Sequence, residues 1–463
     1  MPDTRRPPIA ARGSMGRRTV FWLWLPLALS FTFMMLEGPT VQSAIARLDD
    51  PALNLAAFGM VLGISLIIES PVIMLVSTAI ALAKDAQSYR ALWRFMIGLN
   101  IGLTLLTAFV AWTPLFDLVA GRVLGMPDPI VAAGRSTMRI MLFWTAAIGW
   151  RRFYQGILVR HGYSRRVSYG TALRLLASVA VAFGLVASGG VSGSDVGAFT
   201  LMAGVLIEAA AIHLMALPVV RDQVLTNTAA PEMPLTMGRI TRFHVPLAAT
   251  SLLTLLVQPV TAAALARLAF PRETLAAWPV VFSTLLVLRG WGLALQETTI
   301  AQAKEPAMAR PLRDFTFVVA GVTSLATVVL AFTPLIDVHL RYVIGLAPEL
   351  RGLVRTGIQL ALLLPAITAI TSWIRGLMVA AGATDRVYRG MLANLLLNCA
   401  ALAAGVLLNL PGVPVAATAL VLANAGEYVY LRHAHAEHPN EQQEPATLPT
   451  GQPALAEGTD RRA

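Results

Sequence analysis

The chain has 463 residues, of which 56% are hydrophobic and only 13% are charged, and its net charge is +11. Soluble domains carry about 25% charged residues, so this composition argues against an ordinary soluble domain. The single cysteine, Cys399, excludes an intramolecular disulfide and a cysteine metal site. Apolar runs of about 20 residues recur, the length of a membrane-spanning helix, and they lack the alternation of a β-barrel. We therefore expect an all-α polytopic membrane protein.

Taken in chain order, the first half is expected to begin with a basic cytoplasmic tail, residues 1–19, that leads into a retained first helix. The N-terminal lobe, 20–217, should hold six spans, at 20–46, 54–80, 95–115, 138–158, 168–188 and 197–217. A cytoplasmic linker at 218–242 follows, with prolines at 218, 231 and 234.

The second half is expected to repeat this layout. The C-terminal lobe, 243–432, should hold spans at 243–265, 274–300, 314–335, 356–380, 390–409 and 414–432, which gives about twelve in all. The tail, 433–463, is rich in Glu, Gln, Pro, Thr and Gly, a composition typical of disorder.

An internal repeat supports this division, because shifting the chain by 220 residues aligns it with itself. The only two lysines, Lys84 and Lys304, are 220 apart. The same offset relates prolines, glycines and short polar motifs, including Pro26 and Pro246, Pro39 and Pro259, Thr113-Pro114-Leu115 and Thr333-Pro334-Leu335, and Gly156 and Gly376. An even number of spans returns the chain to the same side, so the two lobes should have parallel topology.

The basic residues set the expected orientation. Most of those in short loops face one side if the N-terminus is inside, which places both termini in the cytoplasm of a cell with a bacterial inner membrane. The net positive charge then reflects insertion topology and not nucleic-acid binding. We expect a monomer that contacts only the lipid bilayer and a small-molecule solute.

Signatures of soluble enzymes are missing from the sequence. Both lysines follow alanine, so there is no Walker A loop, and there is no His-Glu-x-x-His zinc motif. His433, His435 and His438 form a short cluster in the tail, where a metal role competes with simple solvation. We expect no enzyme activity and no cofactor, with H⁺ or Na⁺ as a coupling ion.

Ionisable residues at membrane depth are the candidate functional residues, because they are costly there. Glu37 precedes Gly38-Pro39 in the first span, and a proline kink there would free backbone carbonyls beside the carboxylate. Glu37 is either a coupling or substrate residue or a carboxylate that pairs two helices. Its repeat partner is Val257, so the lobes differ at this position.

Three further positions differ between the copies. Glu69 in span 2 corresponds to Arg289 in span 8, and the two would face each other across a central cavity or else reach the interface. Gln155 corresponds to Arg375, the best central cation, while Arg151 and Arg152 lie one turn earlier than Gln155. The remaining candidates are Pro39, Pro259, Trp291, Glu297 and Trp373. We expect Arg174 to anchor a helix at the boundary, and Glu208 and Glu427 to pack or cap.

The layout of twelve spans in two parallel lobes with a proline-kinked first helix resembles the multidrug and toxic compound extrusion (MATE) type of transporter. That type lies within the multidrug/oligosaccharidyl-lipid/polysaccharide (MOP) exporter superfamily. A closer resemblance, to the progressive ankylosis protein family, rests on four segments: Gly156-Ile157-Leu158-Val159-Arg160-His161-Gly162-Tyr163-Ser164, Gln258-Pro259-Val260 with Arg267, Gly290-Trp291 leading to Glu297, and Arg375-Gly376. That family implies efflux of anions such as pyrophosphate, nucleotides or citrate. The first-span aspartate of many multidrug extruders is not evident, and Glu37 is the only acid there.

Several functions remain open at this point. The arginine bias favours a secondary active exporter of a small anionic organic or phosphate-containing solute, working by alternating access. A multidrug antiporter coupled to H⁺ or Na⁺ and a lipid-linked precursor flippase are alternatives within the same superfamily. A membrane enzyme or scaffold is the alternative from another class.

Overall fold

The computed structural model describes residues 16–227, 235–303, 306–381 and 383–436. These residues form helices, and the nearest approach to a strand among them is one isolated bridge between Ala269 and Pro411. The predicted tails at 1–19 and 433–463 lie mostly outside the described residues, although His433 and His435 end the last helix. Within the described part, no group of three metal-ligating side chains comes together, and His438 lies outside it.

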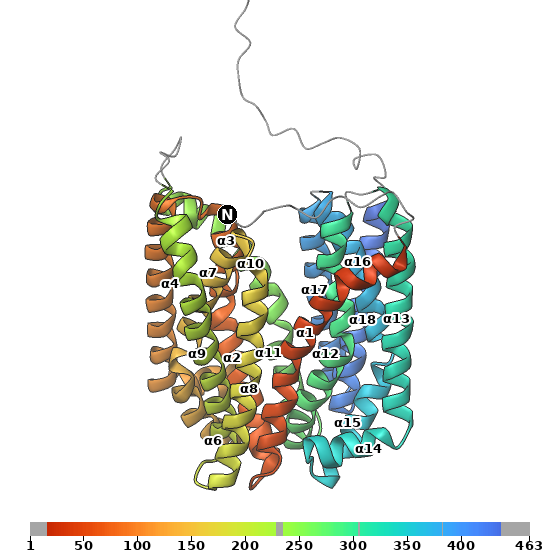
Figure 1. Cartoon of the computed structure of the whole chain (residues 1–463). Helices are drawn as coiled ribbons and strands as arrows, with labels where there is room; N and C mark the ends of the chain where they lie inside the picture. The colour runs from red at the N-terminus through yellow and green to blue at the C-terminus, as the bar shows by residue number, and fades with distance from the viewer. Residues whose placement is uncertain (1–15, 228–234, 304–305, 382, 437–463) are drawn as a thin grey trace, which may run out of the picture.

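The helices of the first half follow the predicted spans (Figure 1). They are α1 (Arg17–Ile45), α2 (Pro51–Ile73), α3 (Leu75–Leu82), α4 (Ala86–Trp112), α5 (Leu115–Asp117), η1 (Leu118–Val123), α6 (Asp128–Ile140), η2 (Met141–Phe143), α7 (Trp144–Arg160), α8 (Ser164–Ser188), α9 (Gly193–Val219) and η3 (Val220–Val224). Helix therefore extends into the region predicted as a linker.

The second half repeats this order. Its helices are α10 (Met237–Leu255), α11 (Val257–Leu265), α12 (Pro271–Gln302), η4 (Pro306–Met308), α13 (Ala309–Phe332), α14 (Leu335–Val338), η5 (His339–Ile344), α15 (Pro348–Leu360), α16 (Leu364–Ala380), α17 (Thr384–Leu407) and α18 (Gly412–Ala436). The break between α10 and α11 falls just before Pro259, whose ring clashes with the carbonyl four residues earlier. Its counterpart α1 is continuous through Pro39, so only the second copy is interrupted there.

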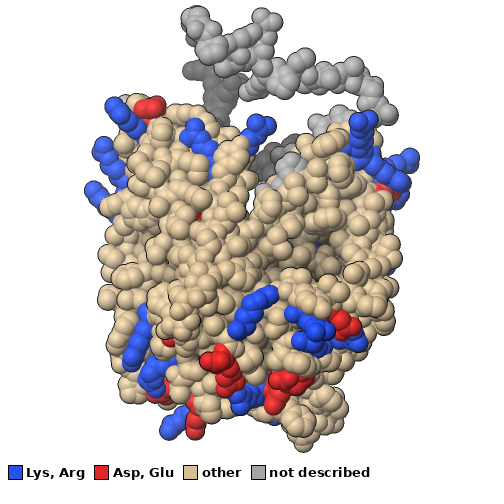
Figure 2. Space-filling model, turned by 60° about the horizontal axis from the view of Figure 1, so that its bottom comes forward, with Lys and Arg blue, Asp and Glu red and all other residues tan. Residues whose placement is uncertain are grey.

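Ten helices in the described residues are long and apolar enough to cross a bilayer, and the bent pair α15–α16 makes an eleventh. The expected fourth span, 138–158, falls in the corresponding pair α6 and α7, which carries more arginine and does not reach that measure. Charged side chains gather at the two ends of the molecule and leave an uncharged band between them (Figure 2). The protein is a multi-pass membrane protein.

Local structure confirms the repeat. Asp50 and Phe270, 220 residues apart, both hold a positive φ where they precede α2 and α12. Salt bridges at the end of the molecule that is lowest in Figure 1, here called the lower end, repeat with the same offset: Arg135 with Asp117 and Arg355 with Asp337.

The first helix of each half packs its N-terminal part on the other half. Val20 and Trp24 of α1 join a cluster with Leu295 and Phe315, and the Trp24 indole N–H donates to the carbonyl of Trp291 at 3.0 Å. In the same way, His244 of α10 donates through Nε2 to the carbonyl of Pro71 at 2.9 Å.

These two contacts are copies of each other, since Trp24 and His244, and Trp291 and Pro71, are each 220 residues apart. The two repeats therefore exchange parts of their first helices and are not two separate bundles.

Candidate functional site

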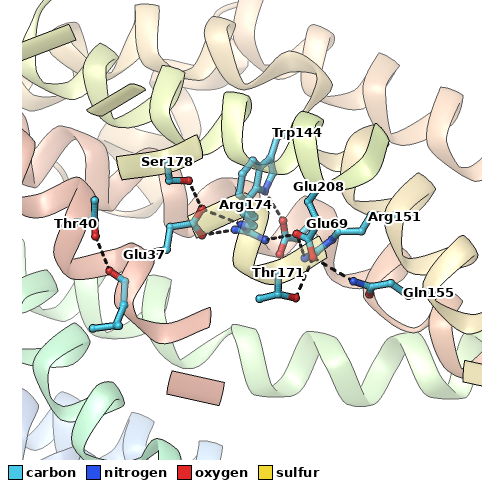
Figure 3. A network of polar contacts seen from close by, with 11 residues as sticks. Glu37, Thr40, Glu69, Trp144, Arg151, Gln155, Thr171, Arg174, Ser178 and Glu208 are labelled. Atoms are coloured by element: carbon cyan, nitrogen blue, oxygen red, sulfur yellow. Dashed lines mark hydrogen bonds and ion pairs between the residues drawn. The ribbon is translucent and has the colours of Figure 1, made fainter. Parts of the chain in front are cut away.

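A buried network of ionic contacts joins α1, α7, α8 and α9 in the first half (Figure 3). The Glu37 carboxylate accepts hydrogen bonds from Arg174 Nε and Ser178 Oγ, both at 2.8 Å, and from Arg174 Nη2. Both partners lie on α8. Glu37 is thus a carboxylate that pairs two helices, which is one of the two roles expected for it.

Glu208 of α9 is the second carboxylate of this network and is fully buried. It accepts from Arg151 Nη1 at 2.6 Å and from Arg174 Nη1 at 3.4 Å. Gln155 Nε2 and Thr171 Oγ1 complete its contacts at 3.3 and 3.2 Å. Arg174 therefore links the carboxylates of α1 and α9, and the prediction that it anchors a helix at the membrane boundary is wrong.

Glu69 of α2 is the third buried carboxylate, and it accepts a hydrogen bond from the Trp144 indole N–H. Arg152 brings a third guanidinium to the same region, and its Nε is buried with no partner among the described residues. Three carboxylates and three guanidiniums thus lie together in the first half. When all are ionised, their charges cancel.

The second half holds a smaller network at the equivalent place. Glu427 of α18, fully buried, accepts from Arg375 Nε at 2.7 Å and from Arg375 Nη2. Asn394 of α17 donates to its other oxygen at 2.9 Å. Because Asn394 corresponds to Arg174, one guanidinium of the first half is replaced here by a neutral amide.

Glu208 and Glu427 are structural equivalents even though they are 219 residues apart and not 220. A Cβ on Gly170 would lie 3.6 Å from Glu208 Cγ, and one on Gly390 would lie 3.5 Å from Glu427 Cγ. The prediction that these two glutamates only pack or cap is wrong, since each is the acceptor at the centre of its network.

Arg289 of α12 has no carboxylate partner among the described residues. Its Nη2 donates to Asn424 Oδ1 at 3.4 Å, and its Nε is buried without a partner. Arg289 and Arg375 therefore face a single carboxylate, Glu427, and one positive charge is left uncompensated. The predicted pairing of Arg289 with Glu69 is absent, because each contacts residues of its own half.

These polar residues of the second half line a cavity of about 240 Å³, here called the C-half cavity. Arg289, Arg375, Asn394, Asn424 and Glu427 contribute its polar surface. A second cavity of about 250 Å³, the seam cavity, lies between α1, α2, α11 and α12. The two cavities share Gln258, Phe282 and Leu286 as lining residues.

The other candidate residues lie outside both cavities. Pro259 packs against α2, where a Cβ on Gly63 would lie 3.7 Å from it, and Pro39 is buried in α1. The Trp291 indole donates to Thr32 at 3.0 Å and so helps to hold α1. Trp373 packs in an apolar cluster with α18, and Glu297 is exposed and forms no ion pair with a described residue.

Sequence reasoning missed Asn394 and Asn424 and misjudged Arg174, Glu208 and Glu427. The glutamates could have been found by allowing the repeat offset to change by one residue, because Glu208 and Glu427 are the carboxylates of the sixth span in each copy. Asn394 would then have followed, since it stands at the position of Arg174 in a chain whose fifth spans otherwise align.

No protein-family model and no curated protein sequence matches the chain. Solved structures do match over most of its length. A multidrug resistance MATE family transporter of the MOP superfamily in an inward-facing conformation aligns with a TM-score of 0.68 and 13% identity, over 92% of this chain and 99% of the other.

Two further structures give similar values. A MOP superfamily transporter from Pyrococcus furiosus, whose binding pocket is described as having reverse polarity, aligns at 0.65 and 15% identity over 94% and 100% of the chains. The lipid II flippase MurJ in an inward closed conformation aligns at 0.68 and 11% identity over 89% and 87%. The chain therefore has the fold of the MATE transporters of the MOP superfamily.

Proposed function

We propose that the protein is a secondary active transporter that exports a small anionic organic or phosphate-containing solute by alternating access. The observation that carries this proposal is the uncompensated guanidinium of Arg289 in the C-half cavity. A buried charge without a partner is costly, and an anion that enters the cavity would supply the missing partner. The resemblance to the ankylosis protein family, with its anionic solutes, agrees with this choice.

Charge balance also argues against a cationic solute. In the first half, Arg174 and Arg151 occupy the oxygens of Glu37 and Glu208, so neither carboxylate is free to receive a cation. In the second half, Glu427 is held by Arg375. A multidrug cation would have to displace an arginine from a buried ion pair, whereas an anion meets Arg289 directly.

The proposed orientation places both termini in the cytoplasm of a bacterial inner membrane. The described residues begin and end at the upper end of Figure 1, and the lower end then faces outside. Hydrogen bonds between the two halves hold the lower end together, among them Arg47 to Ile344 and Arg267 to Leu124. These bonds would have to break when the site opens to the outside.

Transport into proteoliposomes tests the proposal. Radiolabelled citrate, pyrophosphate and ATP are compared with the cation tetraphenylphosphonium, for the wild type and for Arg289→Gln and Arg375→Gln. Each hydrogen bond to a charged group is worth about 1.5–3 kcal/mol, so we expect about a 10- to 100-fold loss of anion uptake in each variant. Arg122→Gln, a change at an exposed arginine that lines neither cavity, should leave uptake unchanged.

Uptake of tetraphenylphosphonium but of no anion would favour the multidrug alternative, and unchanged anion uptake in both variants would refute the assignment of the site. Coupling to H⁺ or Na⁺ is proposed to involve Glu37, whose loss of charge would release Arg174. Glu37→Gln should then abolish the dependence of transport on pH or sodium.

A further inference from the structure

The C-half cavity and the seam cavity lie one after the other along a single face of α12. Phe282 and Leu286 border both, Arg289 lines only the C-half cavity, and Trp278 lines only the seam cavity. Steps of three and four residues place these side chains on the same side of the helix. The shared residues make the two cavities neighbours, and one ligand can occupy parts of both.

The two cavities differ in chemistry. The C-half cavity contains two guanidiniums and one carboxylate, with a net positive charge. None of the described residues that line the seam cavity is charged, and its main polar side chain, Gln42, already bonds to Pro279 O at 3.0 Å and to Ser283 Oγ at 2.5 Å. The rest of its surface comes from Met34, Met60, Leu66 and Trp278.

We propose that the transported anion is amphiphilic, with its anionic group between Arg289 and Arg375 and a compact apolar body that passes Phe282 into the seam cavity. This inference rests on the proposed function and names the class of its solute. Phe282 is seven residues from Arg289, which corresponds to roughly 10 Å along the helix. A ring system of one or two fused rings attached to a sulfonate, carboxylate or phosphate has that length.

Three probes separate the contributions of charge and apolar surface. Naphthalene-2-sulfonate carries both parts, methanesulfonate carries only the anionic group, and 1-naphthylmethylammonium carries the ring with the opposite charge. Binding to the full chain in lipid nanodiscs is measured by calorimetry, and binding to empty nanodiscs is subtracted. We expect naphthalene-2-sulfonate to bind at least 100-fold more tightly than methanesulfonate, because burial of the ring adds to affinity.

Variants locate the two parts of the ligand. Ala262→Phe, which narrows the seam cavity, should weaken naphthalene-2-sulfonate at least tenfold and leave methanesulfonate unchanged. Ala263→Phe, its neighbour on α11 outside the cavity, is the matched control. Gly63→Ala is a second, milder variant, since a Cβ there would make only ordinary contact with Pro259 at 3.7 Å. Arg289→Gln should weaken both sulfonates.

The outcomes separate this inference from the proposed function. Equal affinity for the two sulfonates would overturn the amphiphilic class while leaving an anion transporter. Binding of the naphthyl cation alone would overturn both. Tighter binding of hexadecyl phosphate than of naphthalene-2-sulfonate would overturn the compact apolar body and point to a lipid ligand.

Discussion

Two reciprocal arginine contacts at the lower end allow a quantitative prediction about conformational balance. Arg47, at the end of the first helix of the first half, donates to the carbonyls of Tyr342, Val343 and Ile344 at 3.0, 3.2 and 3.0 Å. Arg267, its repeat equivalent, donates to the carbonyls of Val123 and Leu124 at 2.9 and 2.8 Å. Each guanidinium thus binds the end of a π-helix in the other half.

The same positions explain two glycines. Gly345 and Gly125 follow the two π-helices with φ values of 77° and 73°, a conformation that disfavours side chains. A Cβ at Gly125 would lie 3.0 Å from the Arg267 guanidinium carbon, and one at Gly345 would lie 3.2 Å from Arg47 Nη1. The glycines therefore allow the arginines to approach the backbone, and the arrangement is built twice.

Replacing both arginines by alanine should favour opening of the lower end. Both side chains are exposed, so each hydrogen bond across the seam is worth roughly 0.5–1 kcal/mol and not the full value of a buried charged bond. Five such bonds give a loss of about 2.5–5 kcal/mol, and since about 1.4 kcal/mol is a factor of ten, the population of the lower-open state should rise roughly 100-fold or more.

Spin labels measure this change. With Cys399→Ser as background, Asp128→Cys and Glu349→Cys place labels at exposed sites at the starts of α6 and α15, on opposite halves of the lower end. Electron–electron double resonance should show a new, longer distance in the Arg47→Ala/Arg267→Ala variant. Arg122→Ala, on the first π-helix, is the control. Identical distance distributions in the double variant and the control would refute the reasoning.

Three further predictions concern the interior. Arg174→Ala leaves Glu37 and Glu208 short of a partner, so it should destabilise the protein by about 3–5 kcal/mol and lower its Tm, while Glu37→Gln in the same chain should recover part of the loss; an unchanged Tm would contradict the network. Glu427→Gln removes the only carboxylate of the C-half cavity and should tighten anion binding by roughly tenfold, about 1.4 kcal/mol, as measured by calorimetry, and weaker binding would count against the site. Gly376→Ala brings a Cβ to 2.8 Å from the carbonyl of Gln296 and should cost about 1–3 kcal/mol in thermal unfolding, whereas Gly352→Ala, which meets nothing within 4 Å, should cost less.

Much of the fold could be predicted from the sequence. Hydrophobic length indicated the helices, and the 220-residue offset indicated two copies with equivalent turns, as at Asp50 and Phe270. The exchange of the first helices could not be predicted, because an apolar helix face does not say which half it packs on. Trp24 and His244 make equivalent contacts with different chemistry, so their match is visible only in space.

The candidate site was harder to predict than the fold. The places where the copies differ did include Arg289 and Arg375, which line the C-half cavity together. The partner of each charge stayed hidden, since sequence spacing fixes neighbours on one helix but not the contacts between helices. Arg174 and Glu37 are 137 residues apart and meet only because α1 returns to its own half near Glu37.

Locating a heavy-atom anion in the protein tests the central claim most directly. A structure with 4-bromobenzenesulfonate bound, with the bromine located by anomalous scattering, would show where an anion resides. We predict the sulfonate between Arg289 and Arg375, with the bromine toward Phe282 and the seam cavity. A sulfonate bound beside Arg151 and Arg174 in the first half, or no bound anion at a saturating concentration, would contradict the account.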